Sequence, residues 1–273
     1  MQIEELKILE LTSDTLFKAF MVNERTNTCK ARMIHFITGI DEKLLLKANY
    51  QSIELPVHHK ESKVYKKDVI VRIDKHLLSI EMNRDYYPGL PKKNSQYMKK
   101  VARESYESGE IYDDRMMIQL NFDCYDQYRR NKLIYHFQMM EIDQHFIEDE
   151  NYKKYNINLD SLKNKCYTND ENEELINILR LFTVKSIEEL EALRGEDYMD
   201  EAIDEIKRLC QDENIIGLYD AEAVATKEMN SRLAYAKQQG MKIAAKNMIE
   251  ENMDTSVISK ITGFTKEQIE KLK

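Results

Sequence analysis

Residues 67–83 read KDVIVRIDKHLLSIEMN, and this stretch decides the fold that the sequence predicts. Apolar and polar side chains alternate before and after the step Asp74–Lys75, as they do in two half-buried strands joined by a tight turn. If Asp74 and Lys75 form a two-residue loop, Ile73 pairs with His76. The stretch therefore predicts an antiparallel hairpin with this register.

The predicted register brings two acidic side chains together. Counting outward from the turn places Asp68 opposite Glu81, and directly opposed residues point to the same face with Cβ atoms about 5 Å apart. The aliphatic side chains occupy the other face, which should pack on a helix. Asp-Lys is not a favoured loop sequence, and a slip of one residue would place the acids on opposite faces. Two unrelated surface acids on an exposed hairpin remain the alternative interpretation.

Two converging carboxylates suggest a metal site. Neighbouring carboxylates repel each other, and a hard divalent cation that prefers oxygen ligands can hold both of them ionised. Mg²⁺ is the obvious candidate. Such an ion could polarise a phosphoryl oxygen and lower the pKa of a bound water, which would supply the nucleophile for phosphodiester hydrolysis.

The first 150 residues predict an α/β arrangement around one sheet. A helix or helix pair is expected over 13–39, with Gly39 as its C-terminal cap, and Pro88, Gly89 and Pro91 should break regular structure before a second helix. That second helix is expected at 95–108. The expected strands lie at residues 52–57, 67–74, 76–83, 116–122 and 134–142.

Residues beyond 150 predict a different organisation. Residues 151–172 are polar and favour a linker or a surface excursion, and residues 173–273 predict an all-helical C-terminal region. Its last two helices, expected at 255–262 and 265–272, could form a DNA-reading helix-turn-helix-like pair, although an ordinary helical hairpin is the favoured interpretation. Gly263 should end the first of them, and Thr265 with Gln268 should form a capping box.

A long helix is expected at about 220–251. Its apolar or small residues recur at near-heptad steps, which makes a homodimer through the helical C-terminal region plausible. These residues are Ala225, Met229, Leu233 and Ala236.

Composition limits the class of protein. With 42% hydrophobic and 33% charged residues, a chain of 273 residues should form a packed fold. The formal net charge of −8 argues against a protein that coats nucleic acid by bulk electrostatics, although local Lys and Arg clusters can still meet phosphates. Neither a secretory signal nor an apolar run of membrane-spanning length is present, so we expect a cytoplasmic protein without a membrane partner. Four widely spaced cysteines predict reduced thiols.

Several segments, taken in order, resemble a known family. They are SDTLFKAF (13–20), IELPV (53–57), KDVIVRID (67–74), SIEMN (79–83) and SGEIYDD (108–114), together with the tail NMIEENMDTSVISKITGFTKEQIEKLK (247–273). Together they resemble the PD-(D/E)XK nuclease family transposases, the recombination-promoting nuclease group. The resemblance covers about residues 11–142 and 240–273.

The resemblance implies a restriction-endonuclease-like core over 1–150, with a mixed central sheet flanked by helices. It implies a metal between an Asp on the second core strand, matched by Asp68, and a Glu on the third, matched by Glu81. Asp14 could approach the metal directly or through water. The implied activity is a Mg²⁺-dependent DNA endonuclease of the transposase or recombination-promoting type, in which Mn²⁺ could replace Mg²⁺. The candidate substrate contacts are Lys67, Tyr97, Lys99 and Lys100.

The sequence departs from the family pattern at Asn83, where the superfamily has Lys and this group often has Gln. A carboxamide is neither a general base nor an ammonium, but it can orient a water or a phosphate oxygen. Two other hypotheses therefore stand beside the enzyme. The chain could be a catalytically inactive scaffold of the same fold that binds DNA or a protein partner, or its helical C-terminal half could be the functional module.

Overall fold

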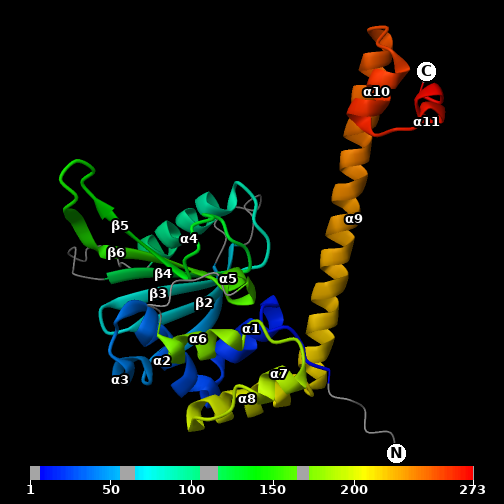
Figure 1. The fold of residues 1–273 in the computed structure, drawn as a ribbon. Coiled ribbons are helices and arrows are strands. Elements are labelled where there is room, and N and C mark those ends of the chain that lie inside the picture. The colour runs from blue at the N-terminus through cyan, green and yellow to red at the C-terminus, as the bar shows by residue number, and fades with distance from the viewer. Residues whose placement is uncertain (1–6, 56–64, 105–115, 165–171, 273) are drawn as a thin grey trace, which may run out of the picture. The chain divides into compact units, whose positions relative to one another are not determined.

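The computed structural model describes residues 7–55, 65–104, 116–164 and 172–272. The chain divides into two compact units, Met1–Tyr219 and Asp220–Lys273. The first unit is an α/β structure with one mixed sheet of six strands and helices on both faces, as predicted (Figure 1).

The sheet has the strand order β1-β2-β3-β4-β6-β5. The strand β4 pairs in parallel with β3 on one side and with β6 on the other, whereas the remaining neighbours pair antiparallel. The strands are β1 (Asn49–Leu55), β2 (Tyr65–Ile73), β3 (His76–Asn83), β4 (Met116–Asp123), β5 (Ile134–Met140) and β6 (Ile147–Asn158).

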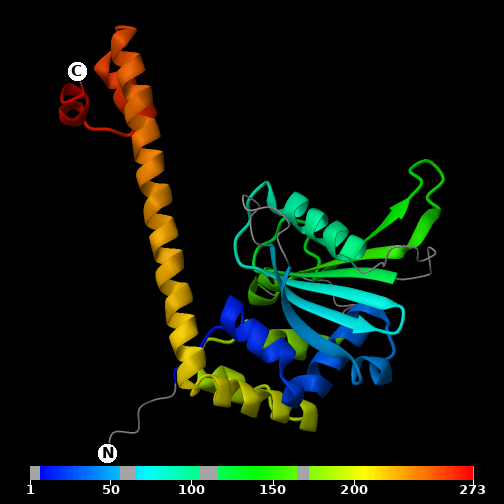
Figure 2. The same cartoon turned by 180° about the vertical axis from the view of Figure 1, so that it is seen from behind.

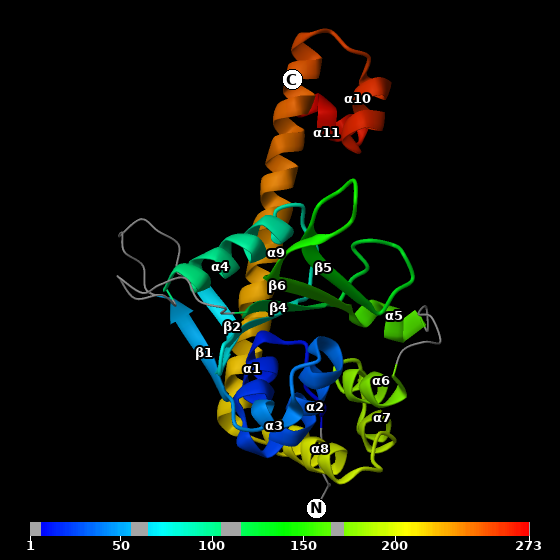
Figure 3. The ribbon, with the colours of Figure 1, turned by 90° about the vertical axis from the view of Figure 1, so that its left-hand side faces the viewer.

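The first unit has three layers, with the sheet between two layers of helices. The helix α4 lies over one face, and α1, α2, α6 and α8 lie on the side of the other face (Figure 3). The helices of this unit are α1 (Asp14–Val22), η1 (Glu24–Thr26), α2 (Asn27–Thr38), α3 (Glu42–Leu45), α4 (Leu90–Glu104), α5 (Leu159–Asn164), α6 (Glu173–Arg180), α7 (Ile187–Glu191) and α8 (Asp197–Leu209).

Capping residues begin and end the first helices. Ser13 caps α1, because its Oγ accepts a hydrogen bond from the backbone N–H of Leu16 at 3.1 Å. Gly39 ends α2 in the left-handed conformation with φ 77°, as the sequence predicts. Phe17 and Phe122 then pack side by side in the core, with ring centroids 5.9 Å apart, and so fix α1 against β4.

A buried charge attaches α8 to this core. The Glu205 side chain is 1% exposed and accepts hydrogen bonds from Asn23 Nδ2 at 2.6 Å and from the Arg208 guanidinium. These partners compensate the cost of removing the carboxylate from water. Because Asn23 follows α1 directly, a helix near residue 200 belongs to the same unit as the N-terminal helices.

The expected linker at 151–172 is wrong. Residues Ile147–Asn158 form β6, which lies inside the sheet between β4 and β5, and α5 follows it. The polar sequence misleads because the first half of β6 is mostly exposed or half-buried and only its last residues are buried. The expected boundary near residue 150 also moves to residue 219, since α6 and α8 supply buried residues to the same core.

Two helix boundaries also differ from expectation. The helix α4 begins at Leu90 rather than near residue 95, because Pro91 falls in the first turn, where a missing N–H costs nothing. The region expected to be helical from residue 173 begins with two separate helices, α6 and α7. Residues 105–108, expected to end the helix at 95–108, lie outside the described residues.

The second unit is helical. It contains most of α9 (Glu213–Glu250), which begins in the first unit, and α10 (Thr255–Thr262) and α11 (Lys266–Glu270) (Figure 2). Ala245, Ile258 and Ile269 form its small buried cluster. Gly263 ends α10 with φ 74°, and the predicted capping box of Thr265 is present. None of the described helices is long and apolar enough to cross a membrane.

Candidate functional site

The β2–β3 hairpin has the predicted register. Ile73 pairs with His76 and Val69 pairs with Ile80 across a two-residue turn. The paired residues end at Val69 and Ile80, one step before Asp68 and Glu81. The negative charge of Glu81 acts on Asp68, so the two acids lie near each other at the end of the hairpin, and the alternative of a one-residue slip is excluded.

Asp68 is largely removed from water. Its side chain is 14% exposed, and its Oδ2 accepts a hydrogen bond from the backbone N–H of Met82 at 2.7 Å. Burial, followed by the negative charge of Glu81, raises the pKa of Asp68 to about 7, although the Met82 N–H and Lys18 favour its ionised form. A cation at this position would therefore remove a substantial electrostatic cost.

Lys18 on α1 is a site residue that sequence reasoning missed. Its Nζ lies 2.6 Å from Asp14 Oδ1 and 3.7 Å from Asp68 Oδ1. Burial by itself would lower the pKa of Lys18, but the hydrogen bond with Asp14 and the charges of Asp68 and Glu81 raise it above its ordinary value. Asp14 is half-exposed and is linked to Asp68 through this ammonium. The helical i,i+4 spacing of Asp14 and Lys18 was a signal for the first of these ion pairs.

Glu81 is the most buried member of the acid pair. Its side chain is 2% exposed, and Ser79 Oγ donates to its Oε1 at 3.5 Å. Glu81 pairs with Asn121 of β4, whose side chain accepts a hydrogen bond from Asn94 of α4, so Glu81 lies on the sheet face that α4 covers. Within the described parts of the chain, no three His, Cys, Asp or Glu side chains gather closely enough to hold a metal together. Two carboxylates still fit Mg²⁺, because this ion keeps several waters and often takes only one or two protein carboxylates.

The Asn83 side chain is held by a second acid. Its Nδ2 donates to Asp123 Oδ1 at 2.8 Å, and Tyr125 Oη donates to the same oxygen at 3.2 Å. Asn156 Nδ2 donates to Asp123 Oδ2 at 2.7 Å. Burial raises the pKa of Asp123 to about 6, while these three donors oppose the shift. The network fixes how the Asn83 carboxamide is turned.

The network continues beneath α4. Asn121 Nδ2 donates to Asn156 Oδ1, Asn94 Nδ2 donates to Asn121 Oδ1, and Gln119 Nε2 donates to the backbone carbonyl of Asn94. Asn94 Oδ1 and Gln119 Oε1 are buried without a hydrogen-bond partner in the structure. Burial also lowers the pKa of Lys154, although the charge of Asp123 opposes this. The face of the sheet below α4 is thus polar as well as buried.

Sequence reasoning missed this polar layer for a physical reason. Gln119, Asn121 and Asp123 alternate with apolar residues along β4, a pattern that normally indicates a solvent-exposed face. Here the strand is central and α4 covers that face, so the same polar residues are buried. The alternation gave the correct faces but not the environment of the polar face.

The predicted substrate contacts are not assembled into one group by the described structure. Lys99 is exposed on α4. The side chains of Lys67, Tyr97 and Lys100 lie outside the part of the chain that the structure describes. Their proposed contacts with DNA therefore stay predictions.

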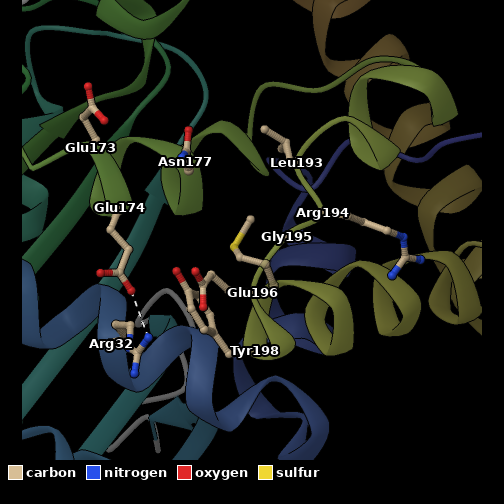
Figure 4. A pocket seen from close by; sticks show the side chains of 10 residues that line it. Arg32, Glu173, Glu174, Asn177, Leu193, Arg194, Gly195, Glu196 and Tyr198 are labelled. Carbon is tan, nitrogen blue, oxygen red and sulfur yellow. Dashed lines mark hydrogen bonds and ion pairs between the residues drawn. The ribbon is translucent and has the colours of Figure 1, made fainter.

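A separate pocket of about 560 Å³ lies between α2, α6 and the connection from α7 to α8 (Figure 4). Arg32 Nη1 donates to Glu174 Oε1 at 2.9 Å inside it, and the Arg32 guanidinium stacks 4.5 Å from the centre of the Tyr198 ring. None of the acids near Asp68 lines this pocket. Arg32 and Glu174 are engaged with each other, and Arg194 is engaged with Glu191 outside the pocket, which is not part of the candidate site.

Comparison with protein families, with curated proteins and with solved structures found no match.

Proposed function

We propose that this protein is a Mg²⁺-dependent DNA endonuclease that hydrolyses phosphodiester bonds and acts in recombination or transposition. The observation that carries the proposal is the acid pair on the β2–β3 hairpin. Asp68 and Glu81 lie near each other at the end of this hairpin, and burial together with the charge of Glu81 raises the pKa of Asp68 to about 7. Such a pair is stabilised by a hard divalent cation.

The arrangement of elements agrees with the resemblance noted in the sequence. A helix precedes three antiparallel strands, and a second helix and a parallel strand follow. Asp68 lies on the second of these strands and Glu81 on the third, which is where a restriction-endonuclease-like core would have its metal ligands. This agreement supports the proposed nuclease class.

Each side chain of the site has a role in the proposal. Asp68 and Glu81 would hold Mg²⁺, which supplies Lewis-acid activation of the phosphate and of a water. Because Nδ2 of Asn83 is engaged by Asp123, its carboxamide oxygen is the end that can accept a hydrogen bond from that water. Lys18 places an ammonium beside Asp68, where it can donate to a phosphate oxygen.

A plasmid assay tests this function. Supercoiled plasmid is incubated with purified protein in Mg²⁺, in Mn²⁺ and in chelator, beside the variants Asp68→Ala and Glu81→Ala. We expect cleavage only with a metal, and a loss of about 100-fold or more in each variant, because each removes half of the ligand set. Asp74→Asn is the matched control, since Asp74 is an exposed acid in the turn of the same hairpin. Unchanged cleavage by Asp68→Ala would reject the assignment.

A specific observation also favours a second function, a metal-free scaffold of the same fold that binds DNA or a protein. Lys18 already provides a counter-charge 3.7 Å from Asp68, and Asn83 replaces the expected lysine. Calorimetric titration with Mg²⁺ separates the two functions. Heat of binding that disappears in Asp68→Ala supports the nuclease, whereas absent Mg²⁺ binding together with retained DNA or protein binding supports the scaffold.

A further inference from the structure

The long helix α9 presents a mostly apolar stripe to solvent. At 1.5 Å per residue its 38 residues span about 57 Å. Along one side of it, large apolar residues that are 58–62% exposed and small residues recur at steps of three and four from Ala225 to Ile243, and Leu218 lies seven residues before Ala225 with Glu222 between them. The stripe consists of Leu218, Ala225, Met229, Leu233, Ala236, Gly240 and Ile243. A stripe of this length on one helix marks an interaction surface.

Gly240 adds an independent observation. A glycine inside a helix costs about 1 kcal/mol relative to alanine. Apart from the neighbouring backbone of its own helix, no described atom lies within 4 Å of the position that a Cβ would take at Gly240, as is also true at Gly217, so packing among the described residues does not require a glycine there. Close approach of a second helix at this position would require it.

The charges of α9 are polarised along its length. The first half carries most of the acidic residues and the second half most of the basic ones. The first half carries Glu213, Asp220, Glu222 and Glu228 with one base, Lys227, and the second half carries Arg232, Lys237, Lys242 and Lys246 with one acid, Glu250. Two such helices attract each other when they run in opposite directions and repel when they run in the same direction.

The stripe is also self-complementary when one copy is reversed. With the pairing centred near residue 231, Leu218 meets Ile243 of the other helix, and Ala225 meets Ala236. Met229 then meets Leu233, so that in these three pairs large residues meet large ones and small meet small, whereas Gly240 meets Ala221 or Glu222. The apolar residues and the charges of α9 both favour an antiparallel pair. The partner that fits this stripe is therefore a second copy of the chain.

We propose that α9 pairs with α9 of a second copy in antiparallel orientation, through the stripe from Leu218 to Ile243. The resulting contact is isologous, because the same surface serves on both sides. This assembly does not rest on the nuclease function, and its test measures molecular mass rather than cleavage.

Single charge reversals on the full chain test the proposal. Glu222 lies within the stripe, whereas Asp220 lies on the opposite side of the helix, so Glu222→Lys and Asp220→Lys make the same charge change on different faces. Sedimentation equilibrium should show a dimer for the wild-type chain. We expect Glu222→Lys to weaken it by about tenfold or more and Asp220→Lys to change it much less. Circular dichroism verifies that both variants keep their helix content.

A charge exchange tests whether the charges of the two helices pair, and the response to salt tests the orientation. The double variants Glu222→Lys/Glu228→Lys and Arg232→Glu/Lys237→Glu should each be monomeric, and their equimolar mixture should dimerise again. Added NaCl should weaken the wild-type dimer, because it screens attraction in the antiparallel pair, whereas it would strengthen a parallel pair by screening repulsion. A monomeric wild-type chain at every concentration, equal effects of Glu222→Lys and Asp220→Lys, or a dimer strengthened by salt would overturn the proposal.

Discussion

Asp123 shows how one buried acid can organise a site without being its ligand. It accepts hydrogen bonds from Asn83, Asn156 and Tyr125, and its side chain lies at the carboxyl end of the central strand β4. An asparagine at this position would present an NH₂ group to one of these donors, and that donor would lose its acceptor. The geometry of Asn83 therefore depends on the charge of its neighbour.

We predict that Asp123→Asn lowers the free energy of unfolding by about 1–3 kcal/mol, because it leaves a buried donor without an acceptor. The loss should depend on pH. The pKa of Asp123 is about 6 in the folded protein, and 3.8 is its ordinary value. Between these pH values the Asp123 carboxyl is therefore protonated in the folded chain and ionised in the unfolded chain. The contribution of Asp123 to the free energy of unfolding of the wild-type protein therefore decreases as the pH rises from about 4 to 6.

Urea denaturation of both proteins at several pH values from 4 to 7 checks this prediction. The difference in unfolding free energy between wild type and variant should become smaller as the pH rises. A difference that grows with pH would show that Asp123 is stabilised in its ionised form and that burial does not dominate its pKa.

Lys18 gives a second prediction at the residue scale. Its ammonium competes with any metal for the charge of Asp68, so Lys18→Met should increase the affinity for Mg²⁺ several-fold, by about 1 kcal/mol. Lys18→Arg keeps the positive charge and is the matched control. Calorimetric titration measures both, and an affinity that falls in Lys18→Met would mean that this lysine does not oppose the metal.

At the scale of the element, the β2–β3 turn fixes the register on which the site depends. Asp74 has φ 48°, in the left-handed region that aspartate tolerates and β-branched residues do not. We predict that Asp74→Val lowers the unfolding free energy by about 1–2 kcal/mol. Lys75→Val, a control at the neighbouring turn residue, which lacks a positive φ, should change it by much less. Thermal unfolding followed by circular dichroism provides the comparison.

Elements stabilised by neighbouring residues could be predicted from sequence. The hairpin register followed from alternation and a two-residue turn, and the C-terminal caps at Gly39 and Gly263 followed from the conformational freedom of glycine. The strand β6 could not be predicted, because its burial comes from parallel pairing with β4, whose paired residues lie 35 positions earlier. Polar residues near 151–158 gave no local sign of this partner.

The candidate site also contains residues that local sequence patterns could predict and residues that they could not. Asp68 and Glu81 were predictable because one hairpin places them together. The hydrogen bonds of Asp123 with Asn83 and Asn156 join three strands that are distant in sequence, and no local pattern connects them. The salt bridge of Lys18 to Asp68 depends on the position of α1 against β2, which also follows from tertiary packing.

For the whole molecule, we predict that a chain ending after Tyr219 folds with an unfolding midpoint within a few degrees of the full-length value. The main hydrophobic core and the residues packed against it all precede this position. A chain ending after Arg194 is the contrasting variant. It lacks α8 with its buried Ile203 and Ile206, and should unfold at a much lower temperature or fail to fold. Differential scanning calorimetry measures both.

The late position of β6 and α8 has a consequence during synthesis on the ribosome. While residues up to about 146 are emerging, β4 is a strand with one unpaired edge, because its neighbour β6 has not yet been made. The apolar surface that α8 will cover stays open for a further 50 residues or so. A nascent chain that stalls in this interval would expose both surfaces, so protection by chaperones is needed most between these two points of translation.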